Sequence, residues 1–159
     1  MFLFANKLFI ALVVLSGAVL TAYFVQRESP AIAAEPAAEG DWLTSWGEAS
    51  MLASDLDRPV FMLFTGSEWC PPCVYLENNA LNTQTFVDYA DASLVLLKYD
   101  FPQRGTITDE MQRMAQKYDG GRLPTWVLVR SDGTELGRGL GVPRGGADEL
   151  LERLHGFGK

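Results

Sequence analysis

The stretch Phe64-Thr65-Gly66-Ser67-Glu68-Trp69-Cys70-Pro71-Pro72-Cys73 contains both cysteines of this 159-residue chain. It continues an apolar run, Val60 to Thr65 (VFMLFT), whose length is that of a strand buried on both faces. A helical stretch to about Ala80 follows the second cysteine. The two cysteines are therefore predicted to lie where a buried strand ends and a helix begins.

The start of this predicted helix favours a reactive Cys70. Pro71 and Pro72 would occupy the first turn, where the N–H groups that proline lacks have no partner within the helix. The partial positive charge at a helix N-terminus favours a thiolate, which is the form of cysteine that attacks disulfides. We therefore predict that Cys70 is the nucleophile. Cys73, one turn further and on the buried side, is predicted to resolve the mixed disulfide that Cys70 forms.

The alternative for this pair is a static, structural disulfide, which is common in exported proteins. A gap of two residues closes a small ring, and such a ring can open without the fold depending on it. Structural disulfides usually close longer loops. The spacing and the position at a helix start together favour a redox-active pair.

The apolar pattern from residue 41 onward alternates between the periods of helices and strands, which is typical of helices layered on a sheet. Strands are predicted at Val60 to Thr65, Leu94 to Tyr99, Thr125 to Arg130 and Thr134 to Leu140, the last two joined by a hairpin turn at Ser131-Asp132-Gly133. Helices are predicted from the spacing of Trp42, Trp46, Ala49 and Ala53, after the cysteines, after a cap formed by Thr106 with Asp109, and around Leu150, Leu151 and Leu154. The predicted element order is close to βαβαβαββα.

A second motif, Leu123-Pro124-Thr125, stands directly before an apolar strand. A proline at this position can simply mark the first residue of an edge strand. The functional interpretation is a cis peptide bond between Leu123 and Pro124, because a cis X-Pro bond usually fixes a tight turn. Such a turn beside the cysteines would leave the backbone of Leu123 free to pair with an extended substrate segment.

These features resemble the thioredoxin superfamily over nearly all of residues 41–159. The matching motifs are W-C-P-P-C at Trp69 to Cys73, Lys98 at the end of the next strand, Lys117-Tyr118 ahead of Gly121-Arg122-Leu123-Pro124-Thr125, and the terminal hairpin and helix. The resemblance implies a three-layer α/β fold with a central mixed sheet and helices on both faces. It also implies that Cys70 and Cys73 are the redox pair, that Pro124 is the cis-proline, and that Trp69 forms an aromatic wall beside the thiols.

The chain departs from thioredoxin itself in the strand before the motif. Thioredoxin has a buried aspartate there, which is thought to move the proton of the resolving cysteine, whereas the corresponding residues here are Met62-Leu63-Phe64. Glu68, by adjacency to the cysteines, and Lys98, which matches a family lysine near that acid, are the candidates for proton transfer. Either residue could instead be an ordinary solvated charge.

We expect the pair to act as a reductant. Strong oxidants of this superfamily stabilise the thiolate, often with a histidine between the cysteines, and a stable thiolate stabilises the reduced protein. Pro71 and Pro72 offer neither a side-chain donor nor a backbone N–H, and Glu68 opposes a negative charge at Cys70. A disulfide oxidase or isomerase of the same fold would use the same residues and differ only in its redox potential.

Composition excludes several other classes of protein. The chain has 13 Lys and Arg against 20 Asp and Glu, a formal charge of −7, so it lacks the basic surface that nucleic acid requires. One histidine and two cysteines are too few for a zinc site with three or four such ligands. A copper-binding module that uses the two thiols is the alternative from a different class, although His155 is poorly placed to add a ligand. No bound cofactor is required beyond the redox-active disulfide.

The N-terminus predicts export. Lys7 is followed by an uncharged, mostly apolar run from Leu8 to Val25, so residues 1–25 are predicted to be a signal peptide or a membrane anchor. Residues 26–40, rich in Ala, Pro and Glu, are predicted to be a flexible tether to a thioredoxin-like domain at 41–159. Either fate places the domain in the periplasm or its equivalent, with membrane contact through residues 8–25 if they are not cleaved.

The sequence thus predicts an extracytoplasmic thiol:disulfide oxidoreductase that reduces cysteine-containing protein substrates. A reductant in that compartment needs its own source of electrons. We therefore expect a membrane disulfide reductant to be its electron donor.

Overall fold

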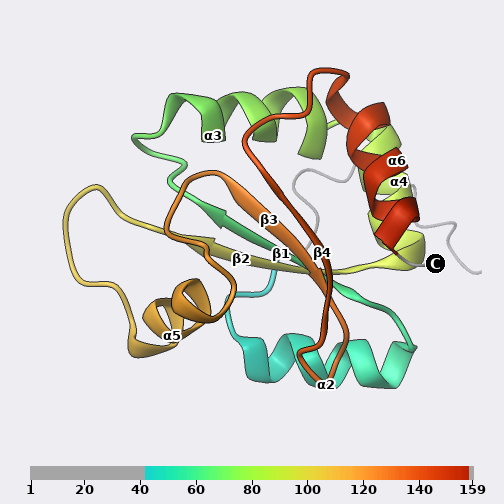
Figure 1. Ribbon diagram of the computed structural model, residues 1–159, viewed down its shortest axis with the longest axis horizontal. Coiled ribbons are helices and arrows are strands. Elements are labelled where there is room, and N and C mark those ends of the chain that lie inside the picture. The colour runs from blue at the N-terminus through green and yellow to red at the C-terminus, as the bar shows by residue number, and fades with distance from the viewer. Residues whose placement is uncertain (1–41, 158–159) are drawn as a thin grey trace, which may run out of the picture. The chain divides into compact units, whose positions relative to one another are not determined.

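A computed structural model describes residues 42–157 of the chain (Figure 1). The predicted signal peptide or anchor at 1–25 and the predicted tether at 26–40 lie outside the described residues. The elements follow in the order α2 (Trp46–Leu56), β1 (Val60–Thr65), α3 (Pro71–Leu76), η1 (Glu77–Leu81), α4 (Gln84–Ser93), β2 (Val95–Asp100), α5 (Asp109–Lys117), β3 (Thr125–Val129), β4 (Glu135–Leu140) and α6 (Gly146–Phe157).

The described strands form one mixed sheet in the order β2-β1-β3-β4. Strand β1 pairs parallel with β2 and antiparallel with β3, and β3 pairs antiparallel with β4. A single parallel bridge from Leu43 to Leu97 adds a short contact beside β2. Strand β1 therefore has a hydrogen-bonded neighbour on each side, and all six of its residues are buried.

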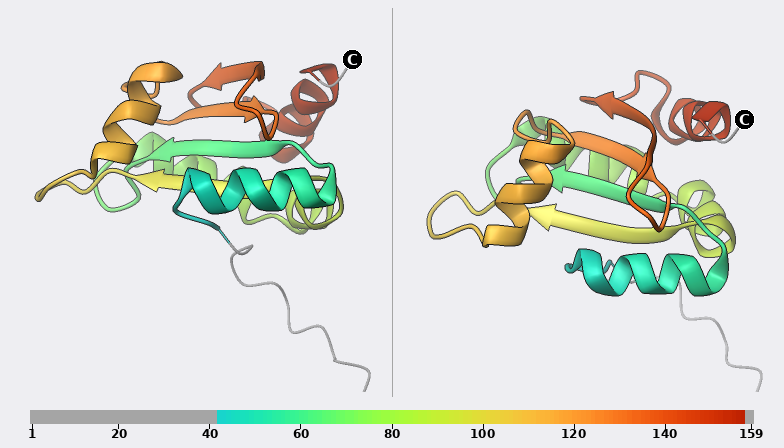
Figure 2. Two further views of the ribbon diagram at one scale, coloured as in Figure 1. Left: turned by 90° about the horizontal axis from the view of Figure 1, so that it is seen from below. Right: turned by 60° about the horizontal axis from the view of Figure 1, so that its bottom comes forward.

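Helices cover both faces of the sheet (Figures 1 and 2). On one face α3, η1, α4 and α6 bury apolar residues such as Leu76, Phe86 and Leu150. On the other face α2 and α5 bury Ala49 and Met114. The expected three-layer α/β fold with helices on both faces is confirmed. None of the helices between residues 42 and 157 combines the length and the apolar character that a membrane crossing requires.

The side chains of β1 alternate between these two layers, as expected for a strand in the middle of the fold. Phe61 and Leu63 pack with α3, η1, α4 and α6, whereas Met62 and Phe64 pack with α2 and α5. The sequence run that predicted a strand buried on both faces is therefore the central strand of the sheet.

Glu110 ties the second helical layer to the sheet. Its Oε1 accepts a hydrogen bond from the Tyr99 hydroxyl at 2.6 Å and another from the backbone N–H of Trp46 at 2.7 Å. Burial, followed by the hydrogen bond to Glu110, raises the pKa of Tyr99, so its hydroxyl stays protonated throughout the neutral range. One carboxylate thereby joins α5, β2 and α2.

Two helix starts differ from the prediction. The helix predicted from Trp42 begins at Trp46, because Leu43 ahead of it forms the bridge to β2. That bridge takes the place of the first strand in the predicted order. The cap predicted at Thr106 with Asp109 is wrong: Thr108 is the N-cap of α5, and its Oγ1 accepts a hydrogen bond from the Met111 N–H at 3.1 Å.

Helix α4 is missing from the prediction, which passes from the helix ending near Ala80 to the strand at Leu94 without a further element. Thr83 caps this helix, and its Oγ1 accepts a hydrogen bond from the Phe86 N–H at 3.4 Å. A threonine ahead of apolar residues at Phe86, Val87 and Ala90 is a helix start signal that the sequence does contain.

The packing of β4 on Trp126 generates a test of the fold. A Cβ added at Gly139 would overlap the Trp126 indole, and Trp126 is fully buried. We predict that Gly139→Ala lowers the free energy of unfolding by about 1–3 kcal/mol, the usual cost of overpacking a core. Urea unfolding measures this difference. Gly156→Ala, where an added Cβ meets nothing within 4 Å, is the control and should lose no stability. Equal midpoints for Gly139→Ala and the unsubstituted chain would contradict the described packing.

Candidate functional site

The two cysteines form a disulfide at the start of α3, with their Cα atoms 5.2 Å apart. Cys70 is the N-cap residue, and Pro71 and Pro72 occupy the first positions of the helix, as the sequence predicts. Cys70 is 6% exposed, whereas Cys73 is fully buried. Cys70 is therefore the cysteine that a sulfur atom from outside can approach.

A tight turn joins β1 to this helix and fixes the position of Trp69. The N–H groups of Trp69 and Cys70 donate to the Gly66 carbonyl at 3.1 and 2.9 Å. A Cβ at Gly66 would lie 2.8 Å from Trp69 Cε2, so the indole packs against the turn at a point where only glycine fits. Trp69 Nε1 donates to the Phe101 carbonyl at 2.7 Å, which fixes the orientation of the ring beside Cys70.

The turn is also held from the end of β2. The Ser67 N–H donates to Asp100 Oδ1 at 2.9 Å, and the Ser67 hydroxyl donates to the other oxygen of the same carboxylate. Asp100 and Phe101 thus hold two successive parts of the turn. The position of the cysteine pair depends on the neighbouring strand as well as on its own helix.

The peptide bond between Leu123 and Pro124 is cis, which is the geometry that the sequence predicts. Thr125, the next residue, lies opposite Phe64 in the register between β3 and β1, so this loop reaches the edge of the sheet where β1 ends. The Pro124 carbonyl accepts a hydrogen bond from the Gly141 N–H at 2.8 Å. Within residues 42–157, neither the N–H nor the carbonyl of Leu123 has a hydrogen-bond partner, so its backbone is available to an extended peptide.

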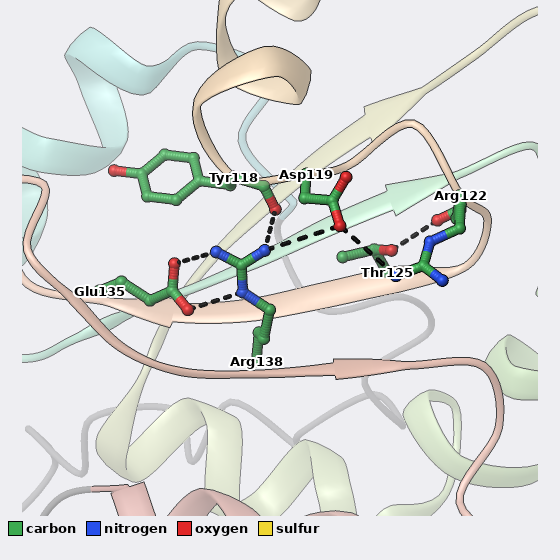
Figure 3. A network of polar contacts seen from close by, with 6 residues as sticks. All are labelled: Tyr118, Asp119, Arg122, Thr125, Glu135 and Arg138. Atoms are coloured by element: carbon green, nitrogen blue, oxygen red, sulfur yellow. Dashed lines mark hydrogen bonds and ion pairs between the residues drawn. The ribbon is translucent and has the colours of Figure 1, made fainter.

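Arg138 of β4 holds the start of the loop that leads to this proline (Figure 3). Its Nε and Nη2 donate to the two carboxylate oxygens of Glu135 at 2.7 and 2.6 Å, and these hydrogen bonds raise the pKa of Arg138. Its Nη1 donates to the Tyr118 carbonyl at 3.2 Å and lies 3.9 Å from an Asp119 carboxylate oxygen. The bidentate pair with Glu135 therefore fixes the Arg138 guanidinium, which binds the backbone at the end of α5.

The same network continues toward the proline. Asp119 has a φ of 51°, in the left-handed region, and its carboxylate lies 3.4 Å from Arg122 Nη2. The Thr125 hydroxyl donates to the Arg122 carbonyl (Figure 3). Both ends of the segment between Asp119 and Thr125 are thus held by polar contacts, with Pro124 between them.

Glu77, a carboxylate that the sequence analysis does not select, lies one helical turn beyond Cys73, and its N–H donates to the Cys73 carbonyl. Residues four apart share a helix face, so Glu77 lies on the side where Cys73 is buried. Its Oε1 accepts a hydrogen bond from Thr65 Oγ1 at 3.0 Å, and its Oε2 lies 3.4 Å from Lys98 Nζ. The spacing from Cys73 is the sequence signal that could have identified this residue.

The two predicted proton-transfer residues lie in different environments. Lys98 is 19% exposed, is paired with Glu77, and places its Nζ 5.1 Å from the centre of the Trp42 ring. Glu68 is exposed in the turn before Trp69. The structure thus joins Lys98, but not Glu68, to the Glu77 carboxylate. A role in proton transfer stays a prediction for both residues.

The arrangement is suited to thiol–disulfide exchange. Reduction of the disulfide would leave Cys70 at a helix N-terminus, where a thiolate is favoured, and Cys73 one turn behind it. Between residues 42 and 157 no group of three or more Cys, His, Asp or Glu side chains is close enough together to hold a metal ion.

Comparisons with known proteins agree with this description. A family model described as thioredoxin-like matches residues 41–131. The chain is 30% identical over 107 residues to a disulfide bond reductase, DsbH, of Chlamydia pneumoniae. That match covers 65% of this chain and 64% of the relative, so the chain spans less than two thirds of the relative's own length.

Solved structures show the same fold. A structure of a DsbH oxidoreductase superposes with a TM-score of 0.68 at 25% identity, covering 77% of this chain and 86% of the other. A thioredoxin from Thermus thermophilus superposes with a TM-score of 0.58 at 27% identity, covering 71% of this chain and 83% of the other.

The position of Glu77 behind Cys73 generates a test of the site. We predict that Glu77→Gln, which keeps the hydrogen bond from Thr65 but removes the negative charge, slows disulfide exchange at pH 7 by about tenfold or more, because Cys73 loses a proton acceptor. The defect should shrink as the pH rises, because hydroxide can then remove the proton. The measurement is the rate of insulin reduction between pH 6 and pH 9, with Glu68→Gln as the matched control at an exposed carboxylate. Equal rates for Glu77→Gln and Glu68→Gln at every pH would contradict this role.

Proposed function

Because the chain belongs to the thioredoxin-like family, we propose that it is an extracytoplasmic thiol:disulfide oxidoreductase that reduces disulfides in protein substrates. The proposal rests chiefly on one observation, the Cys70–Cys73 disulfide at the N-terminus of α3, with Cys70 slightly exposed and Cys73 fully buried. A pair arranged in this way can form a covalent bond to a substrate and then break it from within.

The proposed reaction has two exchange steps. The Cys70 thiolate attacks one sulfur of the substrate disulfide, forming a Cys70–substrate disulfide and releasing the other substrate sulfur as a thiolate. The Cys73 thiolate then attacks Cys70, closing the Cys70–Cys73 disulfide and releasing the second substrate thiolate. The substrate gains two electrons, and the cysteine pair loses two.

Glu77 is the proposed acceptor of the Cys73 proton. It lies on the same helix face as Cys73, and its contacts with Thr65 and Lys98 hold it in place. Lys98 would stabilise the carboxylate while it is charged. Glu68, which is exposed, is the alternative acceptor.

Two observations favour reduction over oxidation. Pro71 and Pro72 lie between the cysteines and offer no hydrogen-bond donor to a thiolate, so the reduced form gains little extra stability. The 30% identical relative is named as a disulfide bond reductase. Oxidation and isomerisation by the same residues are the alternatives, and the redox potential distinguishes them.

The proposed location follows from the N-terminal sequence. The apolar run at residues 8–25 would export the domain or anchor it, leaving it outside the cytoplasm. There the oxidised pair would need two electrons after each cycle, and a membrane disulfide reductant is the proposed donor. Cysteine-containing proteins of the same compartment are the proposed substrates.

A trapping experiment tests the covalent mechanism. We predict that Cys73→Ser forms a stable mixed disulfide with insulin through Cys70, because the thiol that would release the substrate is gone. Non-reducing electrophoresis measures the adduct, and mass spectrometry of adducts from a cell-envelope extract would identify natural substrates. Cys70→Ser is the matched control and should form no adduct. An adduct on Cys70→Ser, or none on either variant, would contradict the assigned order of attack.

The direction of electron flow is tested by redox equilibration of the full-length chain against glutathione. We predict a potential of about −200 mV or lower, in the range of reducing members of the superfamily. A potential near the oxidant end, about −120 mV, would exclude the reductant and favour the oxidase.

A further inference from the structure

The segment that carries Leu123 has little packing in its middle. Gly121 and Arg122 are exposed, and a Cβ added at Gly121 would meet nothing within 4 Å. Asp119 has a φ of 51°, a left-handed conformation that a residue other than glycine adopts only at a cost in free energy. Polar contacts must therefore keep this segment in one conformation.

The hairpin of β3 and β4 holds the start of the segment at two points. The buried side chain of Tyr118 ends in a hydroxyl that donates to the Gly133 carbonyl at 2.8 Å. Arg138 Nη1 donates to the Tyr118 carbonyl at 3.2 Å and lies 3.9 Å from an Asp119 carboxylate oxygen (Figure 3). Tyr118 is thus held through its side chain and through its backbone, and Arg138 also reaches the residue that follows it.

The Asp119 carboxylate extends these contacts toward Leu123. One oxygen, Oδ2, lies between two guanidinium groups, 3.9 Å from Arg138 Nη1 and 3.4 Å from Arg122 Nη2. The Arg122 carbonyl in turn accepts a hydrogen bond from the Thr125 hydroxyl. A continuous set of polar contacts therefore runs from β4 to the residue directly before Leu123.

Arg138 can hold this position because Glu135 fixes its guanidinium. Nε and Nη2 both donate to the Glu135 carboxylate, which leaves Nη1 for the backbone of Tyr118. Within residues 42–157 the Glu135 carboxylate makes no other hydrogen bond or ion pair, so it acts on the segment only through Arg138. Both side chains are partly exposed, and an exposed ion pair contributes little to the stability of a fold.

We propose that Arg138 is a positioning residue for protein substrates: it keeps the segment between Asp119 and Thr125 in the conformation in which the backbone of Leu123 can pair with an extended substrate. The inference rests on the proposed function. Because Arg138 acts through the segment, it affects the binding of a polypeptide and leaves the reactivity of the Cys70 thiol unchanged. A small disulfide that has no peptide backbone reports that reactivity alone.

Arg138→Gln in the full-length chain tests this role. The protein substrate is insulin, with excess dithiothreitol to return the two electrons that each cycle transfers. The small disulfide is 4,4′-dithiodipyridine, which is uncharged: the Cys70 thiolate attacks it, Cys73 then closes the Cys70–Cys73 disulfide, and two pyridinethione molecules are released.

We expect Arg138→Gln to raise the KM for insulin about fivefold, the result of a segment that adopts the binding conformation about one fifth of the time. The kcat for insulin and the rate with dithiodipyridine should stay unchanged, because only binding is weakened. A merely structural role would lower the fraction of active protein, and with it kcat and the dithiodipyridine rate, at an unchanged KM.

Two controls separate position from charge. Glu135→Gln changes the net charge in the opposite direction but releases the Arg138 guanidinium, so it should also raise the KM for insulin. Arg153→Gln breaks an ion pair with Glu149 in α6 and removes the same charge as Arg138→Gln. Arg153 is 46% exposed against 42% for Arg138, and its substitution should keep the KM.

The outcomes separate this inference from the proposed function. An unchanged KM in Arg138→Gln would overturn the inference and leave the proposed function standing. A KM that rises equally in Arg153→Gln, or that does not rise in Glu135→Gln, would assign the effect to net charge and also overturn it. So would a dithiodipyridine rate that falls as far as kcat/KM for insulin. If the unsubstituted chain reduces neither insulin nor dithiodipyridine, the proposed function fails and this inference fails with it.

Discussion

The position of Cys70 depends on how the central strand β1 ends. Its last residues are paired on both sides, Phe64 with Thr125 of β3 and Thr65 with Asp100 of β2. Each neighbouring strand therefore places a functional group near the point where β1 ends. Asp100 accepts a hydrogen bond from Ser67 in the turn, and Pro124 immediately precedes Thr125. The register of β1 against both neighbours therefore decides which residues meet where β1 ends. The cysteine pair is thus positioned by the sheet, and α3 provides its electrostatic environment.

The two faces of β1 have different chemistry near the cysteines. On the face toward α2 and α5, the rings of Phe64 and Tyr99 pack with their centres 5.6 Å apart. Phe64 belongs to the strand in which thioredoxin has its buried aspartate. Here the apolar core therefore continues to the turn before Cys70. On the opposite face, Thr65 contacts Glu77, which comes from the helical segment after the cysteines. An ionised carboxylate taken from water is costly unless it is hydrogen-bonded and paired, and Glu77 has both a hydroxyl and an ammonium group as partners. The Glu77 carboxylate can therefore lie one helical turn beyond Cys73 without interrupting the apolar core.

The sequence predicts those parts of the fold whose pattern lies within a single short segment. Strand β1 has the predicted bounds, because its residues are apolar on both faces and a glycine follows the strand. Helix α4 escapes the prediction although Thr83 is a local start signal, because only Phe86, Val87 and Ala90 of its ten residues are buried and its apolar stripe is short. Cys70 and Pro124 stand in short motifs that are recognisable when they occur together, whereas the contact of Glu77 with Lys98 joins residues 21 apart. That contact exists only once β2 lies beside β1, and it could not be read from the spacing of either residue alone.

An exchange between disulfides replaces one sulfur–sulfur bond with another, so the bonds themselves contribute little selectivity. Selectivity must then come from the surface around Cys70, where an apolar pocket lined by Trp69, Ile107 and Leu123 adjoins the cysteine pair. Burial of one leucine side chain contributes about 1.5–3 kcal/mol. A dissociation constant of 1 mM already requires about 4 kcal/mol, so such a pocket cannot by itself retain a product once a covalent link to it is broken. A contact of this size can favour one disulfide over another and still allow the product to leave after each cycle.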